Sequence, residues 1–295
     1  MNHLNLDQYP NFLQGELSVQ ESCEESALFQ VIPVPLELTV SYGSGAAKGP
    51  LAILEASEQL ERWDGHSEPC IHGIFTQSPV PSDDMLSAQK ELQKRGYEAH
   101  QKSQIPVTLG GEHSITYGVV KGIMDSLGEP IGIIQVDAHA DLRDSYQGHK
   151  HSHASVMNLL AQEGCRICSF GVRALCTEEV EARKKFSVIH WDAEELVTQN
   201  ILEITLPDGF PKYVYISFDL DGLDPAILPA TGTPVPGGIS YYQSLSLIRS
   251  ALKDRICVGL DVMELAPIEG QPVSDFTAAL ITYRLMGLAA AHRSQ

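Results

Sequence analysis

The sequence predicts an α/β protein in which a parallel sheet is covered by helices on both faces. Short apolar and β-branched runs alternate with helix-like patterns along nearly the whole chain, and this alternation is typical of a parallel sheet with helical crossovers. No repeat, low-complexity tract or linker divides the 295 residues. We therefore expect one domain spanning residues 1–295, of which 1–27 form an N-terminal extension.

Seven of the apolar runs are expected to be strands, with helices between them. The expected strands are 28–34, 105–109, 131–136, 167–172, 188–191, 213–218 and 256–262. Pro50 suits the first turn of a helix that carries Ile53 and Leu60. Ser240 and Gln243 form a capping box at the start of another helix.

Composition and charge exclude several classes of partner. Hydrophobic residues make up 43% of the chain and charged residues 20%, as in a folded globular protein. With 38 acidic against 20 basic side chains the formal charge is -18, so we expect neither nucleic acid nor an anionic membrane surface as a partner. A small cationic substrate is favoured instead. The first twenty residues are polar and no apolar run approaches a membrane span, so a cytoplasmic location is expected.

The six cysteines are too sparse for a disulfide scaffold and are expected to be reduced. Cys165 and Cys168 form a CxxC pair, which elsewhere can bind zinc or act in redox chemistry. Since no second pair lies nearby and the neighbours are apolar, we interpret both as core residues.

Potential metal ligands follow three of the expected strands, at the carboxyl ends where ligands collect in parallel sheets. They are His113, Asp137, His139, Asp141, Asp219 and Asp221. Any one of them alone is more typical of a helix cap or a core histidine. Four carboxylates converging on one buried place would repel one another unless a positive charge lay among them. The pattern favours divalent cations, with manganese or a related ion suiting these donors and nickel, cobalt or iron remaining possible.

The segments around these ligands resemble the signature motifs of the ureohydrolase family, which includes arginases and agmatinases. The matching stretches are 110–114 (GGEHS), 137–141 (DAHAD), 217–225 (SFDLDGLDP), 229–234 (PATGTP), 237–238 (GG) and 259–264 (GLDVME). They are collinear with the family from about residue 28 to the end of the chain.

This resemblance implies an arginase-like, three-layer α/β/α sandwich with a mainly parallel sheet and two Mn²⁺ ions per chain. In the family pattern, Asp137 and Asp219 bridge the two ions. His113 and Asp141 complete one metal site, and His139 and Asp221 complete the other. The family also suggests a homo-trimer or homo-hexamer.

Three further roles follow from the family pattern and from the chemistry of guanidinium hydrolysis. Two ions that share one water can present hydroxide near neutral pH, which a resonance-stabilised guanidinium requires. Asp141 is then the nearest general acid for the departing amine. Glu264 resembles the family glutamate that pairs with the substrate guanidinium. Within the tract of three histidines, His153 matches the proton-shuttling histidine, and His151 is the alternative.

The expected reaction is hydrolysis of agmatine to putrescine and urea. After Asp141 the chain reads LRDSY over 142–146, which resembles agmatinases and lacks the Asn-, Thr- and Ser-rich stretch that holds the amino-acid carboxylate in arginases. Arg143 leaves open a guanidino acid such as guanidinobutyrate, because an arginine in the pocket can clamp a carboxylate. A metal-dependent deacylase and a non-catalytic homologue fit less well, since Glu264 and all six ligands are present. Loop 224–240 is expected to close over the metals, and loop 42–50 to do the same at the other rim.

Overall fold

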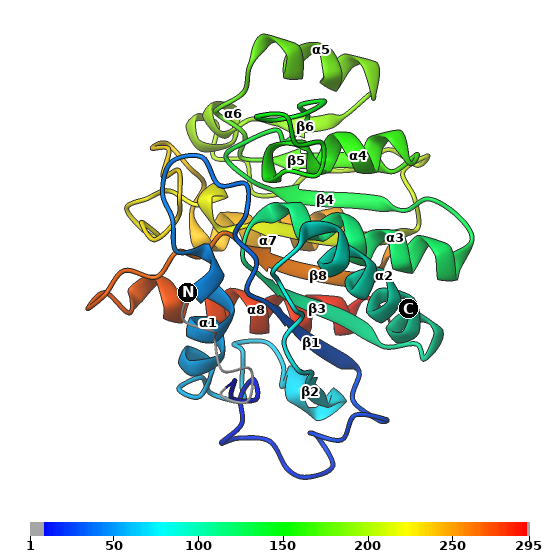
Figure 1. The fold of residues 1–295 in the computed structure, drawn as a ribbon, viewed down its shortest axis with the longest axis vertical. Helices are drawn as coiled ribbons and strands as arrows, with labels where there is room; N and C mark the ends of the chain where they lie inside the picture. The colour runs from blue at the N-terminus through cyan, green and yellow to red at the C-terminus, as the bar shows by residue number, and fades with distance from the viewer. Residues whose placement is uncertain (1–8, 294–295) are drawn as a thin grey trace.

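The computed structural model describes residues 9–293, and a single eight-stranded sheet organises them (Figure 1). Its strands are β1 Phe29–Val34, β2 Ile74–Thr76, β3 Ile105–Gly110, β4 Gly132–Val136, β5 Arg166–Phe170, β6 Ile189–Trp191, β7 Tyr213–Asp219 and β8 Ile256–Met263. The spatial order is β2-β1-β3-β8-β7-β4-β5-β6. Every registered strand pair is parallel.

Helices cover both faces of this sheet, which confirms the three-layer α/β/α sandwich (Figure 1). The helices are α1 Gly49–Ser57, α2 Met85–Gln101, α3 Thr116–Leu127, α4 Val156–Gln162, α5 Thr177–Lys185, α6 Ala193–Thr198, α7 Tyr241–Ala251 and α8 Val273–Ala291. Side chains of α1, α6, α7 and α8 share one hydrophobic core with the sheet. Side chains of α2, α3 and α4 share a second core on the opposite face.

The strands alternate between these two cores because successive side chains in a strand point to opposite faces. In β4, Ile134 and Val136 belong to the core of α7 and α8, whereas Ile133 belongs to the core of α2 and α3. All five residues of β4 are buried. Burial on both faces explains why the strands appear in the sequence as continuous apolar runs.

All seven expected strands are present, with ends that differ by a few residues. The eighth strand, β2, was missed because it has only three residues at the edge of the sheet. Helix α1 has Pro50 in its first turn but ends at Ser57, so the expectation that Leu60 belongs to it was wrong. Helix α7 starts as expected, with the Ser240 hydroxyl accepting the Gln243 N–H at 3.2 Å.

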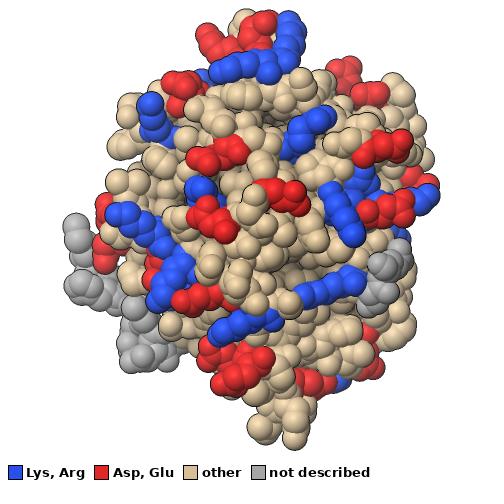
Figure 2. All heavy atoms as spheres, turned by 90° about the vertical axis from the view of Figure 1, so that its right-hand side faces the viewer, with Lys and Arg blue, Asp and Glu red and all other residues tan. Residues whose placement is uncertain are grey.

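The cysteines of the CxxC pair lie inside the protein. Cys165 and Cys168 are free and buried, so the CxxC pair belongs to the core as expected. Burial raises the pKa of the Cys165 thiol to about 12. Among residues 9–293, no helix is long and apolar enough to span a bilayer. On the face shown in Figure 2, basic and acidic side chains are interspersed.

Candidate functional site

The strand order explains why distant motifs meet at one place. Strands β3, β8, β7 and β4 are consecutive neighbours in the sheet, and their carboxyl ends lie at the same edge. His113 follows β3, Asp137 follows β4, Asp219 ends β7 and Glu264 follows β8. Four segments that are far apart in the sequence therefore contribute to one buried cluster.

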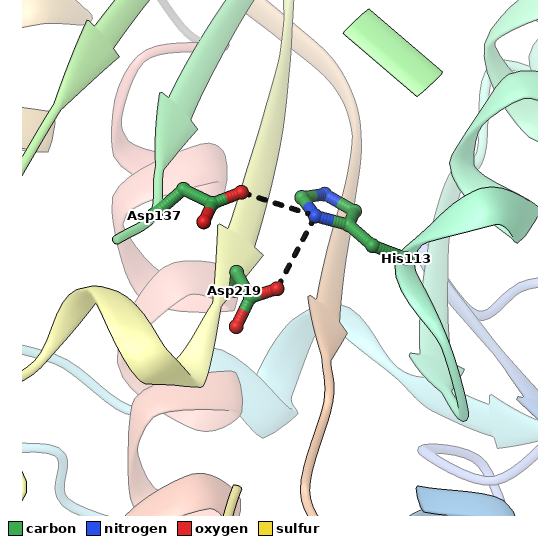
Figure 3. Close-up of side chains that lie close together, drawn as sticks. All are labelled: His113, Asp137 and Asp219. Atoms are coloured by element: carbon green, nitrogen blue, oxygen red, sulfur yellow. Dashed lines mark ion pairs between the residues drawn. The ribbon is translucent and has the colours of Figure 1, made fainter. Parts of the chain in front are cut away.

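His113 lies at the centre of the first group of ligands (Figure 3). Its Nδ1 atom is 3.2 Å from Asp137 Oδ2, 3.0 Å from Asp141 Oδ2 and 3.3 Å from Asp219 Oδ2. All four side chains are buried. Within the described residues this Nδ1 atom has no partner in hydrogen-bond geometry. A buried nitrogen without a hydrogen bond that faces three carboxylates is the arrangement expected of a metal ligand.

The second group shares Asp137 with the first. His139 Nδ1 is 3.6 Å from Asp137 Oδ1 and 3.1 Å from Asp221 Oδ2. In each of the two groups, His113-Asp137-Asp219 and Asp137-His139-Asp221, the potential ligand atoms lie within 4.8 Å of one another. Asp137 is thus common to both groups, as its predicted bridging role requires. The bridging role of Asp219, which belongs to the first group only, stays a prediction.

The spacing of the motifs holds these carboxylates in place through short local hydrogen bonds. Asp137 Oδ1 accepts the His139 N–H at 2.6 Å, and Asp219 Oδ1 accepts the Asp221 N–H at 2.9 Å. In both, the backbone N–H of residue i+2 donates to the aspartate side chain of residue i and fixes it at the end of a strand. Gln135 Nε2 donates to Asp137 Oδ2 at 2.9 Å from within β4. The DxH and DxD spacings are therefore structural as well as chemical requirements.

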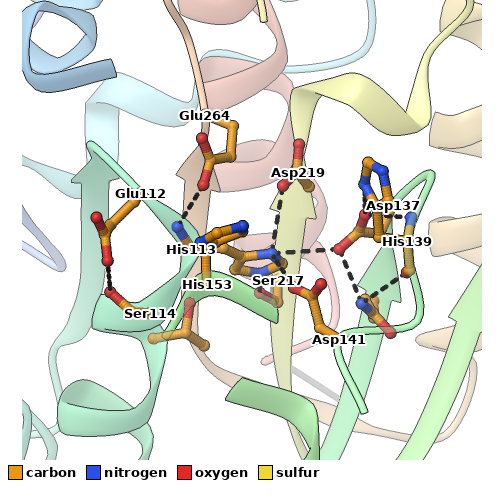
Figure 4. Close-up of polar contacts among 12 residues, drawn as sticks. Glu112, His113, Ser114, Asp137, His139, Asp141, His153, Ser217, Asp219 and Glu264 are labelled. Atoms are coloured by element: carbon orange, nitrogen blue, oxygen red, sulfur yellow. Dashed lines mark hydrogen bonds and ion pairs between the residues drawn. The ribbon is translucent and has the colours of Figure 1, made fainter. Parts of the chain in front are cut away.

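A buried chain of hydrogen bonds sets the orientation of the His113 ring (Figure 4). Ser217 Oγ donates to Asp261 Oδ1 at 3.0 Å, so it accepts from His113 Nε2 at 2.7 Å. Thr116 Oγ1 donates to the other Asp261 oxygen at 2.8 Å. The proton of the imidazole is thereby placed on Nε2, and Nδ1 keeps its lone pair for the ligand cluster.

Burial and crowding perturb the protonation of the ligand cluster. Burial, together with the Asp137 carboxylate, raises the pKa of Asp141 to about 7. Burial also raises the pKa of Glu264 to about 8, against the hydrogen bond from the His113 N–H. Burial alone would lower the pKa of His139, but Asp137 and Asp221 raise it to about 12. Divalent cations would relieve this crowding of carboxylates, so the donors fit two such ions.

Two of the proposed catalytic residues have left-handed backbone conformations. Asp141 has a φ of 53° and Glu264 a φ of 67°. Outside glycine this region costs on the order of 1 kcal/mol or more, and such residues cluster at functional sites. The backbone turn places Asp141 beside His113, and it brings Glu264 Oε1 to 2.7 Å from the His113 N–H.

The ligand cluster opens into a narrow inner pocket of about 30 Å³. His153 and Glu264 line this pocket together with His113, His139 and Asp141. The lining thus includes all three predicted catalytic residues and every predicted metal ligand except Asp137.

His151 lies elsewhere, with its ring 5.5 Å from the Tyr117 ring in an edge-to-face contact. It is not among the residues that line the inner pocket. His153, in contrast, lies beside the cluster (Figure 4).

A wider outer chamber of about 430 Å³ adjoins the inner pocket and shares His139, Asp141 and His153 with it. Arg143 and Glu179 are among the residues that line this chamber. The Arg143 guanidinium carbon lies 5.4 Å from the centre of the Tyr146 ring, and its Nε is 3.9 Å from Glu179 Oε2. Arg143 therefore already has an acidic and an aromatic neighbour.

The two loops expected to close over the metals do line the inner pocket. Gly43 N–H donates to Gly232 O at 3.1 Å and joins the loops backbone to backbone. A Cβ atom at Gly43 would lie 2.7 Å from that carbonyl oxygen, so the approach requires glycine there. Thr233 Oγ1 donates to Asp221 Oδ2 at 3.3 Å. Arg173, which the sequence analysis missed, donates to Val235 O at 2.6 Å and holds the longer loop in place.

Known proteins resemble this chain in both sequence and fold. The family model described as the arginase family matches residues 27–287. The N(1)-aminopropylagmatine ureohydrolase of Synechocystis is 36% identical over 267 residues, which cover 87% of both chains. The agmatinase of Pyrococcus horikoshii is 29% identical over 90% of this chain and 93% of its own. The solved agmatine ureohydrolase of Thermoplasma volcanium is 29% identical, with a TM-score of 0.78 and coverage of 96% and 97%.

Proposed function

Because this chain belongs to the arginase family, we propose that it hydrolyses the guanidinium group of agmatine to putrescine and urea with two divalent metal ions. It is an agmatinase-like ureohydrolase, a hydrolase that acts on C–N bonds of linear amidines. The observation that carries the proposal is the pair of ligand groups that share Asp137 at the carboxyl ends of β4 and β7. Oxygen-rich donors with two imidazoles favour Mn²⁺.

In this proposal each ligand has a defined place. Asp137 and Asp219 would bridge the two ions, His113 and Asp141 would complete one site, and His139 with Asp221 would complete the other. Two bound ions would supply hydroxide near neutral pH by lowering the pKa of a water that they share. The protein itself must orient the guanidinium and move protons.

Glu264 is proposed to orient the substrate, because its half-buried carboxylate lines the inner pocket and can pair with a planar guanidinium. Cleavage breaks the bond between the guanidinium carbon and the nitrogen of the tail, and that nitrogen must gain a proton to leave as an amine. Asp141 is the proposed donor, since it lines the inner pocket beside the ligand cluster and is the nearest acid to the departing nitrogen. His153 is proposed to exchange protons between the pocket and solvent.

Agmatine is preferred over a guanidino acid because of what surrounds Arg143. Its guanidinium already contacts the Tyr146 ring and lies near the Glu179 carboxylate, so a substrate carboxylate would meet an acidic neighbour as well. Glu179 is buried, with its two oxygens accepting the Leu142 and Cys176 N–H groups. A cationic or neutral tail suits this chamber better than an anionic one.

N(1)-aminopropylagmatine is a second candidate substrate, and two observations favour it. The 36% identical relative from Synechocystis carries that name. The outer chamber of about 430 Å³ next to the inner pocket offers room for a tail longer than that of agmatine. The extra ammonium of this substrate would lie near the Glu179 carboxylate.

A panel of guanidines with urea detection tests this proposal. Burying the arginine carboxylate without a partner costs several kcal/mol, so we expect kcat/KM for agmatine to exceed that for arginine by about 100-fold or more. The same panel includes N(1)-aminopropylagmatine and guanidinobutyrate. If N(1)-aminopropylagmatine gives the higher kcat/KM, the longer polyamine is the substrate.

Replacement of Arg143 distinguishes agmatine from a guanidino acid as the substrate. If guanidinobutyrate is the best substrate and Arg143→Ala removes that activity alone, Arg143 clamps a carboxylate and the agmatine assignment fails. The matched control is Lys185→Ala, since Lys185 also lies over an aromatic ring, that of Phe186 at 4.6 Å, but outside the chamber. If none of these guanidines releases urea, the agmatine proposal is wrong, and a smaller or unrelated guanidine is the next substrate to test.

A further inference from the structure

A buried carboxylate next to the ligand cluster is not used by the proposed reaction. Glu112 is fully buried and precedes His113 in the chain. Its Oε2 accepts the N–H groups of Leu38 and Thr39, and its Oε1 accepts the hydroxyls of Thr39 at 2.7 Å and Ser114 at 2.6 Å. A carboxylate surrounded by four donors acts as an acceptor only. Thr39 must therefore direct its single hydroxyl proton to Glu112.

The Thr39 hydroxyl also contacts His153 twice. Figure 4 shows the positions of Glu112 and His153 in the site. Its oxygen accepts the His153 backbone N–H at 3.1 Å and lies 3.0 Å from His153 Nδ1. A hydroxyl has one proton and two lone pairs. With the proton committed to Glu112, Thr39 can only accept from the imidazole, so Nδ1 must carry the proton. Nε2 then keeps its lone pair.

We propose that Thr39, held by Glu112, is a positioning residue that fixes the neutral tautomer of His153 and leaves Nε2 free to take a proton in the pocket. The inference deepens the proposed function, because it rests on His153 as the proton carrier. An acceptor that fixes Nδ1–H is the usual way in which a protein chooses between the two imidazole nitrogens. Here the acceptor comes from a loop 114 residues away in the sequence.

The neighbouring histidine of the tract has no such arrangement. His151 Nδ1 is buried and has no hydrogen-bond partner among the described residues. Its ring packs on Tyr117, whereas the His153 ring packs on Tyr146 at 5.4 Å. Within this tract, the contact with Thr39 therefore distinguishes the histidine that lines the pocket from the one that does not.

The test compares Thr39→Val, which keeps the shape and removes the hydroxyl, with Thr39→Ser, which keeps the hydroxyl. We expect Thr39→Val to lower kcat for the preferred guanidine by about 10-fold or more, with KM changed much less, and Thr39→Ser to restore most of kcat. In a His153→Ala background, Thr39→Val should cause no further loss. Thr282→Val, which removes a buried hydroxyl in α8 far along the chain, is the matched control.

Nitrogen NMR of the imidazole gives a readout that does not depend on activity. In metal-free protein labelled with ¹⁵N-histidine, the signals lost in His153→Ala identify the His153 ring. We expect a protonated Nδ1 and an unprotonated Nε2 in the wild type, and a mixture of both tautomers in Thr39→Val. An Nε2–H tautomer in the wild type would overturn the inference even if urea release is confirmed. An equal loss of kcat from Thr39→Val with or without His153 would overturn it as well.

Discussion

Removal of divalent metal is expected to abolish urea release, and addition of Mn²⁺ is expected to restore it. The reason is that a guanidinium is too poor an electrophile for neutral water, and the crowded carboxylates of the site offer no other source of hydroxide. Treatment with a chelator, followed by dialysis and a urea assay with and without Mn²⁺, measures the effect. Full activity in protein shown by elemental analysis to be metal-free would exclude the mechanism.

Variants that lack one metal ligand should differ in how much metal they lose, according to whether the ligand belongs to one group or to both. Asp137 belongs to both groups, so Asp137→Ala should reduce metal content at both sites. His139 belongs to one group, so His139→Ala should mainly weaken one site. Elemental analysis of the purified variants gives the metal content per chain. His190→Ala is a suitable control, because that side chain is 41% exposed and remote from the cluster in the sheet order.

Substitution of His153 by alanine is expected to lower kcat by roughly 100-fold or more, the typical contribution of a positioned proton carrier. Both metal ions should remain bound, since His153 lines the pocket but belongs to neither ligand group. Burial lowers the pKa of His153, which keeps the ring neutral and ready to accept a proton at neutral pH. Steady-state kinetics and metal analysis on the same preparation separate loss of proton transfer from loss of metal.

His151→Ala is the matched control, because it removes a histidine from the same tract whose ring packs on Tyr117. It should leave kcat nearly unchanged. If His151→Ala lowers kcat and His153→Ala does not, the assignment of the shuttle within the tract is reversed.

The strands could be predicted from the sequence because burial on both faces leaves a long apolar run. This is clear for β4, in which all five residues are buried. The same reasoning could not find β2, since three residues at a sheet edge carry too short a pattern. It also extended α1 to Leu60, because helical spacing continues past Ser57 while the chain itself leaves the helix there.

The ligand cluster was predictable because each ligand stands directly after a recognisable strand or within a motif of spacing two. Contacts between loops carried no such signal. Thr39 lies in a segment without a strand or helix and meets His153 only because two loops converge at the sheet edge. Ser217 and Asp261 lie inside matching motifs, but their role in orienting His113 depends on hydrogen bonds between neighbouring strands. Such residues require the three-dimensional structure.

The left-handed conformations of Asp141 and Glu264 have a consequence for engineering this enzyme. Glycine adopts φ values of 53° and 67° without steric cost, but it also removes a carboxylate, which is buried at Asp141 and half-buried at Glu264. In metal-free protein, glycine would relieve this backbone cost, so a screen for heat resistance alone is expected to enrich Asp141→Gly although that variant lacks a carboxylate that the proposed reaction needs. At Glu264 the gain is offset, because its carboxylate accepts the His113 N–H. Selection therefore has to monitor turnover alongside melting temperature, because relief of backbone strain and catalysis make opposite demands at these two positions.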